Sequence, residues 1–417
     1  MAITLRLSKP KLTDSIMAIF VFVLILDPSN YYLGLKSPLF FLAIVACLST
    51  YNSIPSKVVV PVCVIYGGML FTSMMGFLSG HTPESDTLAF FYKSFLMIFL
   101  ILWSNHLRIL EKVLFPALLV SGLVIFIYIS MLTSPILEKA IYAYLSSAGE
   151  SVPILMGRRT FIGIEIISVY HKVCVLFLLP MSIYCYKWLN EKRHKWKNFL
   201  LTFFVLLPVI AGGNRANILS GIAIIGILLL QKLWQTRLGK VISVFSVVIG
   251  TAGSLILVSM LMSDTDEPSL SAKISLFNSW YEHIIRHPSI LLWGQGIGTT
   301  FATEVRGEAT ISEWTYLELI RWFGVPIALA VVTVYLYPMY RMFKGQGKLP
   351  YRKPLTIAYI FYLLVGATNP VLLNSTGMLS LLIMYSYALN PTYRLHDKSQ
   401  PIVLPEAKCY NISSSSF

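Results

Sequence analysis

Long apolar segments alternate with short polar or basic stretches along almost the whole chain. A perpendicular helix needs roughly 20 residues to cross the hydrocarbon layer of a membrane, so the pattern predicts an all-α integral membrane protein with about 12 transmembrane helices. These helices occupy residues 1–390, and a polar tail follows over residues 391–417. The expected spans are residues 15–34, 38–50, 58–79, 88–103, 113–132, 166–186, 199–213, 216–233, 241–262, 315–337, 355–372 and 375–390.

Two long polar intervals, at about residues 133–165 and 263–314, interrupt the apolar pattern. Each contains apolar residues at helical spacing, which predicts an amphipathic helix lying in the membrane interface. The apolar positions are Ile136, Leu137, Ala140, Ile141, Tyr144 and Leu145 in the first interval, and Ile274, Phe277, Tyr281, Ile284 and Ile285 in the second. His287-Pro288 should end the second helix, and the glycines of Gly294-Gln-Gly296-Ile-Gly298 predict an irregular turn after it.

Charge sets the expected orientation. Hydrophobic residues make up 56% of the 417 and charged residues 12%, with a formal net charge of +14. The basic residues cluster in alternate short loops, chiefly 187–197, 232–240 and 341–353, as the positive-inside rule requires of cytoplasmic loops. Both termini are therefore expected in the cytoplasm and both long loops in the periplasm. Basic clusters in such loops indicate contact with anionic membrane lipids and argue against nucleic acid as a partner.

Several familiar cofactor and metal patterns do not fit. The five cysteines have no paired spacing, which argues against a disulfide framework or a zinc site. The Gly294–Gly298 run lacks the spacing and the preceding strand of a nucleotide-binding turn. Asp264, Asp266 and Glu267 are expected to form a solvated acidic turn. The sequence thus predicts no cofactor and no metal.

Outward-facing arginines are the first candidates for chemistry. Gly157-Arg158-Arg159 follows the first amphipathic helix, and Arg215 lies in the tight turn Gly212-Gly213-Asn214-Arg215 between two spans. A guanidinium binds phosphate through two hydrogen bonds and stays charged at any working pH. These arginines would suit a diphosphate-linked lipid; the alternative is that they bind lipid headgroups or cap helix ends.

Carboxylates and histidines near the membrane give a second group of candidates. Glu313 lies at the mouth of the expected span 315–337 and is a candidate general base, with stabilisation of the first helical turn as the alternative. Glu318 and Arg321 are three residues apart on one helix, where an ion pair is the plainest explanation. His171 and Lys172 fall inside an expected span, which suggests that they face a polar cavity. His287 is expected on the polar side of an interfacial helix.

Three motifs resemble the bacterial O-antigen polymerase and O-antigen ligase superfamily. They are Asn214-Arg215-Ala-Asn-Ile-Leu at the start of a span, the stretch Trp280–Gly298 with its His-Pro step and glycine turn, and Glu313–Gly324 entering the next span. Together they cover about a tenth of the chain. Asn214 stands where the family usually has serine, and Glu313 where the ligases have a histidine that serves as base. The second departure favours a polymerase.

The resemblance implies a metal-independent glycosyltransferase that polymerises undecaprenyl-diphosphate-linked oligosaccharide at the periplasmic face of the bacterial inner membrane. Alternatives are a ligase that transfers the glycan to lipid A–core, and a flippase without chemistry. A chain-length regulator is a further partner that the resemblance allows. Glu313 and Arg215 are the expected catalytic residues. The expected substrate-binding residues are Arg158, Arg159, Arg286, His287, His171, Tyr316, Glu318 and Arg321.

Overall fold

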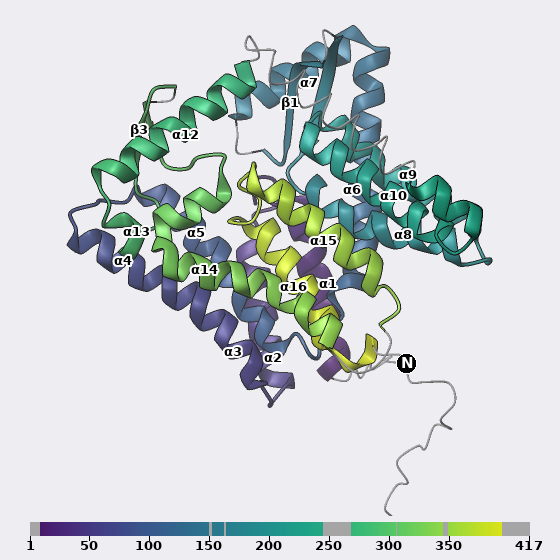
Figure 1. Cartoon of the computed structure of the whole chain (residues 1–417), viewed down its shortest axis with the longest axis horizontal. Coiled ribbons are helices and arrows are strands. Elements are labelled where there is room, and N and C mark those ends of the chain that lie inside the picture. The colour runs from purple at the N-terminus through teal and green to yellow at the C-terminus, as the bar shows by residue number, and fades with distance from the viewer. Residues whose placement is uncertain are drawn as a thin grey trace, which may run out of the picture.

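The computed structural model describes residues 9–149, 152–161, 164–244, 268–305, 307–344 and 349–393, and within these ranges the chain is mostly helical (Figure 1). The first half contains α1 (Lys9–Leu26), α2 (Lys36–Thr50), α3 (Ser56–Val62), η1 (Cys63–Gly67), α4 (Gly68–Leu78), α5 (Ser85–Phe95), η2 (Leu96–Trp103), α6 (Ile109–Thr133), α7 (Pro135–Ala148), β1 (Ile154–Phe161), β2 (Ile164–His171), η4 (Cys174–Phe177), α8 (Leu178–Asn190) and α9 (Lys195–Ala211). The second half contains α10 (Arg215–Leu233), α12 (Pro268–Arg286), α13 (Ile290–Trp293), β3 (Phe301–Thr303), β4 (Gly307–Ala309), α14 (Thr315–Lys344), α15 (Arg352–Ala367), α16 (Ser375–Leu389) and η5 (Pro391–Tyr393).

The prediction of a helical membrane protein is confirmed at the level of its apolar helices. Five stretches of the described chain are long and apolar enough to cross a membrane: Ser56–Leu78, Ser85–Trp103, Ile109–Thr133, Arg215–Leu233 and Thr315–Lys344. Their outer faces carry large exposed apolar side chains, including Phe77, Phe126 and Leu329, which suits contact with lipid. The total of twelve spans stays a prediction, since the expected span 241–262 falls mostly outside the described residues.

The expectation of an all-α fold is wrong between α7 and α8. Residues 154–161 and 164–171 form an antiparallel hairpin in which Arg158 pairs with Ile167 and Arg159 with Ile166. The expected span 166–186 therefore starts as a strand, and only its second half is helical. Apolar β-branched residues such as Ile166 and Ile167 suit either state, so a short apolar run does not separate strand from helix. A second small sheet pairs β3 with β4.

Helix α16 forms the centre of the bundle and is buried along almost its entire length. Its first turn is fixed by Asn374, whose Oδ1 accepts hydrogen bonds from the backbone N–H groups of Thr376 and Gly377. Helices α14, α1, α5 and α6 and the η2 segment pack around it. This position makes the segment before α16 a fixed platform inside the bundle.

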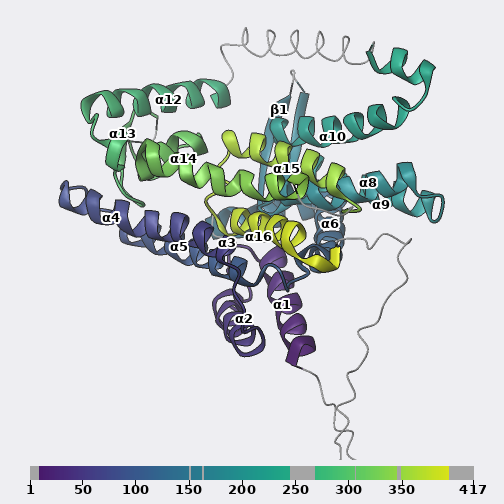
Figure 2. The same ribbon diagram turned by 60° about the horizontal axis from the view of Figure 1, so that its bottom comes forward.

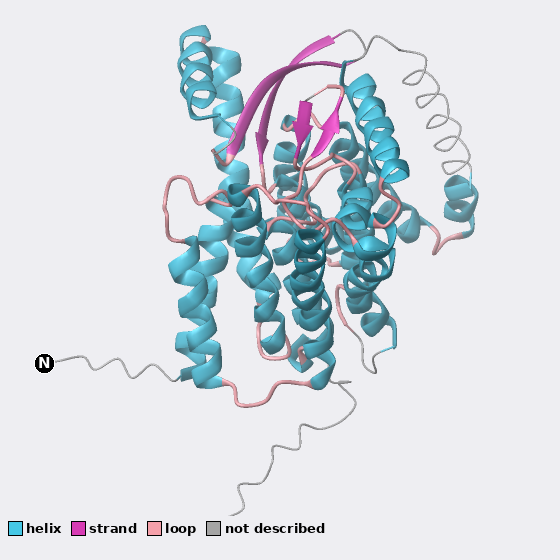
Figure 3. Cartoon of the chain, turned by 90° about the vertical axis from the view of Figure 1, so that its left-hand side faces the viewer, coloured by secondary structure: helices cyan, strands magenta, loops and turns pink. Residues whose placement is uncertain are grey.

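Contacts between elements separate the two ends of the bundle. Thr13 and Thr50 meet through their hydroxyls at 2.7 Å, and Asn390 Nδ2 donates to Leu107 O at 2.9 Å, so these residues share one end. The opposite end carries Lys36, Asn214, Thr315 and Ser375, and we call it the loop end. Figure 3 shows both sheets gathered at one end of the helices, and Figure 2 shows α12 and β1 together, away from α2.

The loop end therefore collects the parts that the charge pattern assigns to the periplasm. The break expected at Asp27-Pro28 is present, because α1 ends at Leu26 and the buried Asp27 carboxylate accepts three backbone N–H groups from Tyr31, Tyr32 and Leu33. Which end faces the cytoplasm stays a prediction from the charge pattern.

Helix α12 ends at Arg286, directly before His287-Pro288, and exposes apolar residues although it also packs on the protein. Leu276, Trp280 and Ile284 are buried beneath it. Ile274, Phe277, Tyr281 and Ile285 are each 41–59% exposed on its outer side. A helix that is apolar on both its buried and its outer side suits a place at the membrane interface.

Candidate functional site

The segment between α15 and α16, residues 368–374, receives side chains from three other parts of the chain, and we call it the 368–374 loop. Asn214 Nδ2 donates to Asn369 Oδ1 at 3.0 Å, and Thr315 Oγ1 donates to Asn369 O at 2.7 Å. Lys273 Nζ, from α12, donates to Thr368 O at 3.4 Å. The loop thus joins the starts of α10 and α14 to the interfacial helix.

Arg215 is the first residue of α10 and is half-buried. Asn214 caps this helix, because its Oδ1 accepts from the backbone N–H of Ala216 at 3.0 Å. The turn before it is held by the strand β2, since Ser168 Oγ donates to Gly212 O at 2.7 Å. A cation at a helix N-terminus opposes the helix dipole, whereas an anion bound there is favoured by both the dipole and the guanidinium. Arg215 at this position therefore favours the binding of an anionic ligand and does not stabilise the helix.

Asn217, two residues after Arg215, is completely buried. Its amide Nδ2 and Oδ1 have no hydrogen-bond partner among the described residues. Buried polar side chains are nearly always paired, and an unpaired one costs about 1–3 kcal/mol. The first turn of α10 thus holds a buried amide with no hydrogen-bond partner among the described residues.

Glu313 lies directly before α14, where its carboxylate is 3.4 Å from the Lys273 ammonium. The two side chains are 32% and 25% exposed, so the pair is reachable from solvent. Trp314 Nε1 donates to Lys273 O at 3.1 Å and fixes α12 beside the start of α14. The ion pair thus places the Glu313 carboxylate at the edge of the bundle, beside α12.

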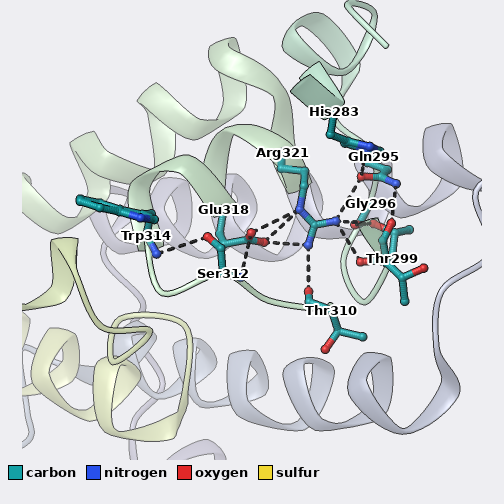
Figure 4. Close-up of polar contacts among 10 residues, drawn as sticks. His283, Gln295, Gly296, Thr299, Thr310, Ser312, Trp314, Glu318 and Arg321 are labelled. Carbon is teal, nitrogen blue, oxygen red and sulfur yellow. Dashed lines mark hydrogen bonds and ion pairs between the residues drawn. The ribbon is translucent and has the colours of Figure 1, made fainter. Parts of the chain in front are cut away.

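Arg321 and Glu318 form a second polar centre, which is fully buried (Figure 4). The guanidinium of Arg321 contacts the Glu318 carboxylate at 2.7 Å and also donates to Gln295 Oε1, Thr299 O and Thr310 O. Glu318 in turn accepts from the backbone N–H of Ser312 at 3.0 Å. We call these residues the Arg321 network. The Arg321 network holds Gln295, Thr299, Thr310 and Ser312 against α14. Arg321 and Glu318 therefore position this segment.

Glycines allow the turn Gly294–Gly298 to pack closely against the backbone of α14. Gly294, Gly296 and Gly298 have φ values of +75°, +90° and +82°, as the irregular turn requires. A Cβ at Gly294 would lie 2.3 Å from Trp322 O, and a Cβ at Gly324, the break inside α14, would lie 2.5 Å from Leu292 O. The two backbones approach so closely that neither position admits a side chain.

Three histidines surround Gln295 at the outer side of the Arg321 network. The ring of His287 lies 5.1 Å from that of His283 and 6.2 Å from that of His81. His283 Nε2 is 3.1 Å from Gln295 Oε1. Burial lowers the pKa of His283 to about 4, with Arg321 adding to the effect, and burial also lowers the pKa of His81. His283 and His81 therefore favour the neutral form more than an exposed histidine does.

The remaining predicted binding residues lie apart from the 368–374 loop. Arg158 is exposed and pairs with Glu138 of α7 at 2.8 Å, with Arg159 beside it on β1. Arg286 is exposed and pairs with Glu282 at 3.0 Å. Arg158 and Arg286 belong to the surface of the loop end, where their exposed ion pairs suit a place at lipid headgroups.

Two of the predicted binding residues serve the packing of the bundle. His171 is buried at the end of β2, where its Nε2 lies 3.3 Å from Leu26 O. Tyr316 OH donates to Leu363 O at 3.0 Å and joins α14 to α15. Of the two residues expected to face a polar cavity, Lys172 lines one and His171 does not.

The sequence analysis missed Lys273, Asn369, Gln295 and Asn217. Thr368-Asn369-Pro370 stands at the end of an expected span, and a polar triplet there was a usable signal. Lys273 and Asn217 gave none, because a lysine in a polar interval and a single amide in a span are both common. The acidic turn of Asp264, Asp266 and Glu267 lies outside the described residues.

No group of three or more His, Cys, Asp or Glu side chains in the described part of the chain is arranged to hold a metal ion. Comparison of the chain with protein-family models, with curated proteins and with solved structures found no match. The site therefore has to be interpreted from its own geometry.

Proposed function

We propose that this protein is a membrane glycosyltransferase that extends a lipid-linked glycan at the outer face of a bacterial inner membrane. The observation that carries the proposal is the convergence of the turn before Arg215 and the Lys273–Glu313 pair on Thr368 and Asn369 of one loop. A diphosphate-binding cation and a carboxylate thus flank the same fixed segment, at the ends of apolar helices. Lipid-linked substrates would reach this place from the membrane.

In this mechanism Arg215 binds the diphosphate of the donor, and the helix N-terminus adds to the attraction. The acceptor hydroxyl oxygen attacks the anomeric carbon, and its proton passes to the Glu313 carboxylate. The bond between the anomeric carbon and the diphosphate oxygen breaks, and the departing polyprenyl diphosphate keeps the electron pair. Stabilising that developing charge is the main electrostatic requirement of the reaction.

Two further features support the proposal. The exposed apolar side of α12 provides a surface on which a polyprenyl chain or the interface lipid can lie next to Lys273. The resemblance of Asn214-Arg215 and Glu313–Gly324 to the polymerase and ligase superfamily points to the same chemistry, and Glu313 in place of a histidine favours polymerisation.

The test uses purified protein in lipid nanodiscs with undecaprenyl-diphosphate-linked repeat units, in excess EDTA. We expect a ladder of longer lipid-linked glycans, formed without added metal. Transfer that occurs only when lipid A–core is supplied would assign the ligase reaction. No transfer to either acceptor by well-folded protein would overturn the glycosyltransferase proposal.

A further inference from the structure

A separate cavity of about 500 Å³ opens at the loop end, between the end of α1, helix α5 and the start of α16. The turn 28–31 forms one wall, and Asn374, Ser375 and Thr376 form another. Phe90 of α5 and Tyr31 line it with aromatic rings that are 48% and 45% exposed. The cavity thus combines polar walls with apolar rings.

Two lysines supply its charge. Lys172 lines the cavity, and its Nζ donates to Ser29 Oγ at 3.0 Å. Lys36 lies behind the wall, where its Nζ donates to two lining residues, to Pro28 O at 3.0 Å and to the hydroxyl of Ser375. The two ammonium groups repel each other, and the buried Asp27 attracts Lys36. An anion between the lysines would relieve that repulsion.

We propose that this cavity binds a carboxylate or phosphate group, with Lys172 and Lys36 as its charge partners and the hydroxyls of Ser29, Ser375 and Thr376 as hydrogen-bond donors. A lysine ammonium is a compact charge that attracts oxyanions strongly when it is partly removed from water. The aromatic rings of Tyr31 and Phe90 offer flat apolar faces to the rest of the ligand. The chemical class of ligand is therefore an acidic or phosphorylated sugar.

That the ligand is a sugar rests on the proposed function, whereas the binding of an oxyanion does not. The cavity wall at Asn374 is the end of the 368–374 loop, whose other end receives Asn214 and Lys273. A charged sugar held in the cavity would be anchored to the same rigid segment as the reacting groups. This arrangement would select substrates that carry an acidic unit.

Binding of simple probes tests the inference without any turnover. Full-length protein in an uncharged detergent is titrated calorimetrically with glucuronate, inorganic diphosphate and glucose, at low and high salt. We expect binding of glucuronate or diphosphate, weakened by salt, and none of glucose. Glucuronate alone would identify a sugar carboxylate as the ligand group, and diphosphate alone a phosphate.

Variants locate the binding. Lys172→Gln and Lys36→Gln should each weaken the bound probe about 10-fold or more, the loss of about 1.4 kcal/mol. Lys172→Arg should retain much of the affinity, and Lys139→Gln, an exposed lysine on α7, should behave as the unaltered protein. Elution volume and melting temperature, measured without probe, check that each variant is folded. If Lys36→Gln does not fold, Lys172→Gln alone tests the site.

Three results would overturn the inference. The first is that the unaltered protein binds neither oxyanion. The second is that Lys172→Gln, correctly folded, binds them with full affinity. The third is that Arg215→Ala abolishes the binding while Lys172→Gln leaves it intact, which would assign the anion to the start of α10. These binding measurements need no turnover, so they can be interpreted even if no glycosyl transfer is seen in nanodiscs.

Discussion

Arg321 and Arg215 both lie near the start of a helix at the loop end, yet their surroundings differ. Arg321 is fully buried, and its guanidinium is shared among a carboxylate, a side-chain amide and backbone carbonyls. Arg215 is half-buried at a helix N-terminus, and the amide of Asn217, two residues further along the helix, has no partner among the described residues.

The difference separates structural from chemical roles. A buried charge whose hydrogen bonds are all made holds its neighbours in place and has nothing left for a ligand. Arg215 is half-buried at a helix N-terminus, where the helix dipole favours an anion, so an anionic ligand can reach it. The sequence already favours an ion pair for Arg321 and chemistry for Arg215, although both are among the expected site residues.

Breaking the Arg321 network should have the largest effect on stability. Glu318→Ala leaves the Arg321 charge buried without its carboxylate, which typically costs about 3–5 kcal/mol. The variant should melt at a much lower temperature or fail to accumulate in membranes. The matched control is Glu282→Ala, because the Glu282–Arg286 pair is exposed and such pairs contribute little. Equal melting temperatures for the two variants would contradict the structural role of Arg321.

Removing the unsatisfied amide should act in the opposite direction. Asn217→Leu replaces a buried unpaired amide with an apolar group of similar shape, so the free energy of unfolding should rise by about 1 kcal/mol or stay unchanged. Transfer activity should stay near normal, because Asn217 is completely buried and does not share a helix face with Arg215. Thermal unfolding and the nanodisc assay measure the two effects. A destabilised variant with full activity would show that Asn217 is a structural residue.

Lowering the pH should have the smallest effect. The pKa of His283 is lowered to about 4 from an unfolded value of 6.5, so the unfolded chain binds a proton more readily between these values. The stabilising contribution of neutral His283 is complete above pH 6.5 and is lost as the pH falls towards about 4. Nearby His81, His287 and Arg321 make protonation there less favourable.

Melting temperatures at pH 7.5 and pH 5 measure this effect. We expect His283→Gln to reduce the pH-dependent drop by about 2 °C, since the group is only half removed from water. His194→Asn, at an exposed position, is the control and should leave the drop unchanged. If His283→Gln loses as much melting temperature between pH 7.5 and pH 5 as the unaltered protein does, protonation of His283 is not linked to folding.

The sequence predicted the helices well because apolar length and helix-ending residues act locally. Asp27-Pro28 and His287-Pro288 end helices through backbone geometry that needs no distant partner. The hairpin of β1 and β2 was missed because its second strand, including Ile166 and Ile167, is as apolar as a span. Its state is decided by pairing with β1, which no local pattern reveals.

The candidate site was predictable only in part. Arg215 and Glu313 stood out as charges beside apolar segments, but Asn369 and Lys273, which connect them, are ordinary polar residues until the fold brings them together. The same holds for Glu318 and Arg321, whose burial depends on docking of the segment 294–312. Spacing along a helix shows that two charges can pair, and does not show whether the pair is sealed from substrate.

The most direct test of the account concerns Arg215. Arg215→Ala and Arg215→Lys are compared in the nanodisc assay, as long-chain glycan formed per unit of folded, membrane-inserted protein. Loss of one charge-assisted contact to the leaving group costs about 2–4 kcal/mol of transition-state stabilisation, roughly 30- to 1000-fold in rate. Lysine loses the planar fork, so we predict that both variants are impaired while their melting temperatures stay near that of the unaltered protein. Full-length glycan made at the normal rate by folded Arg215→Ala would contradict the account.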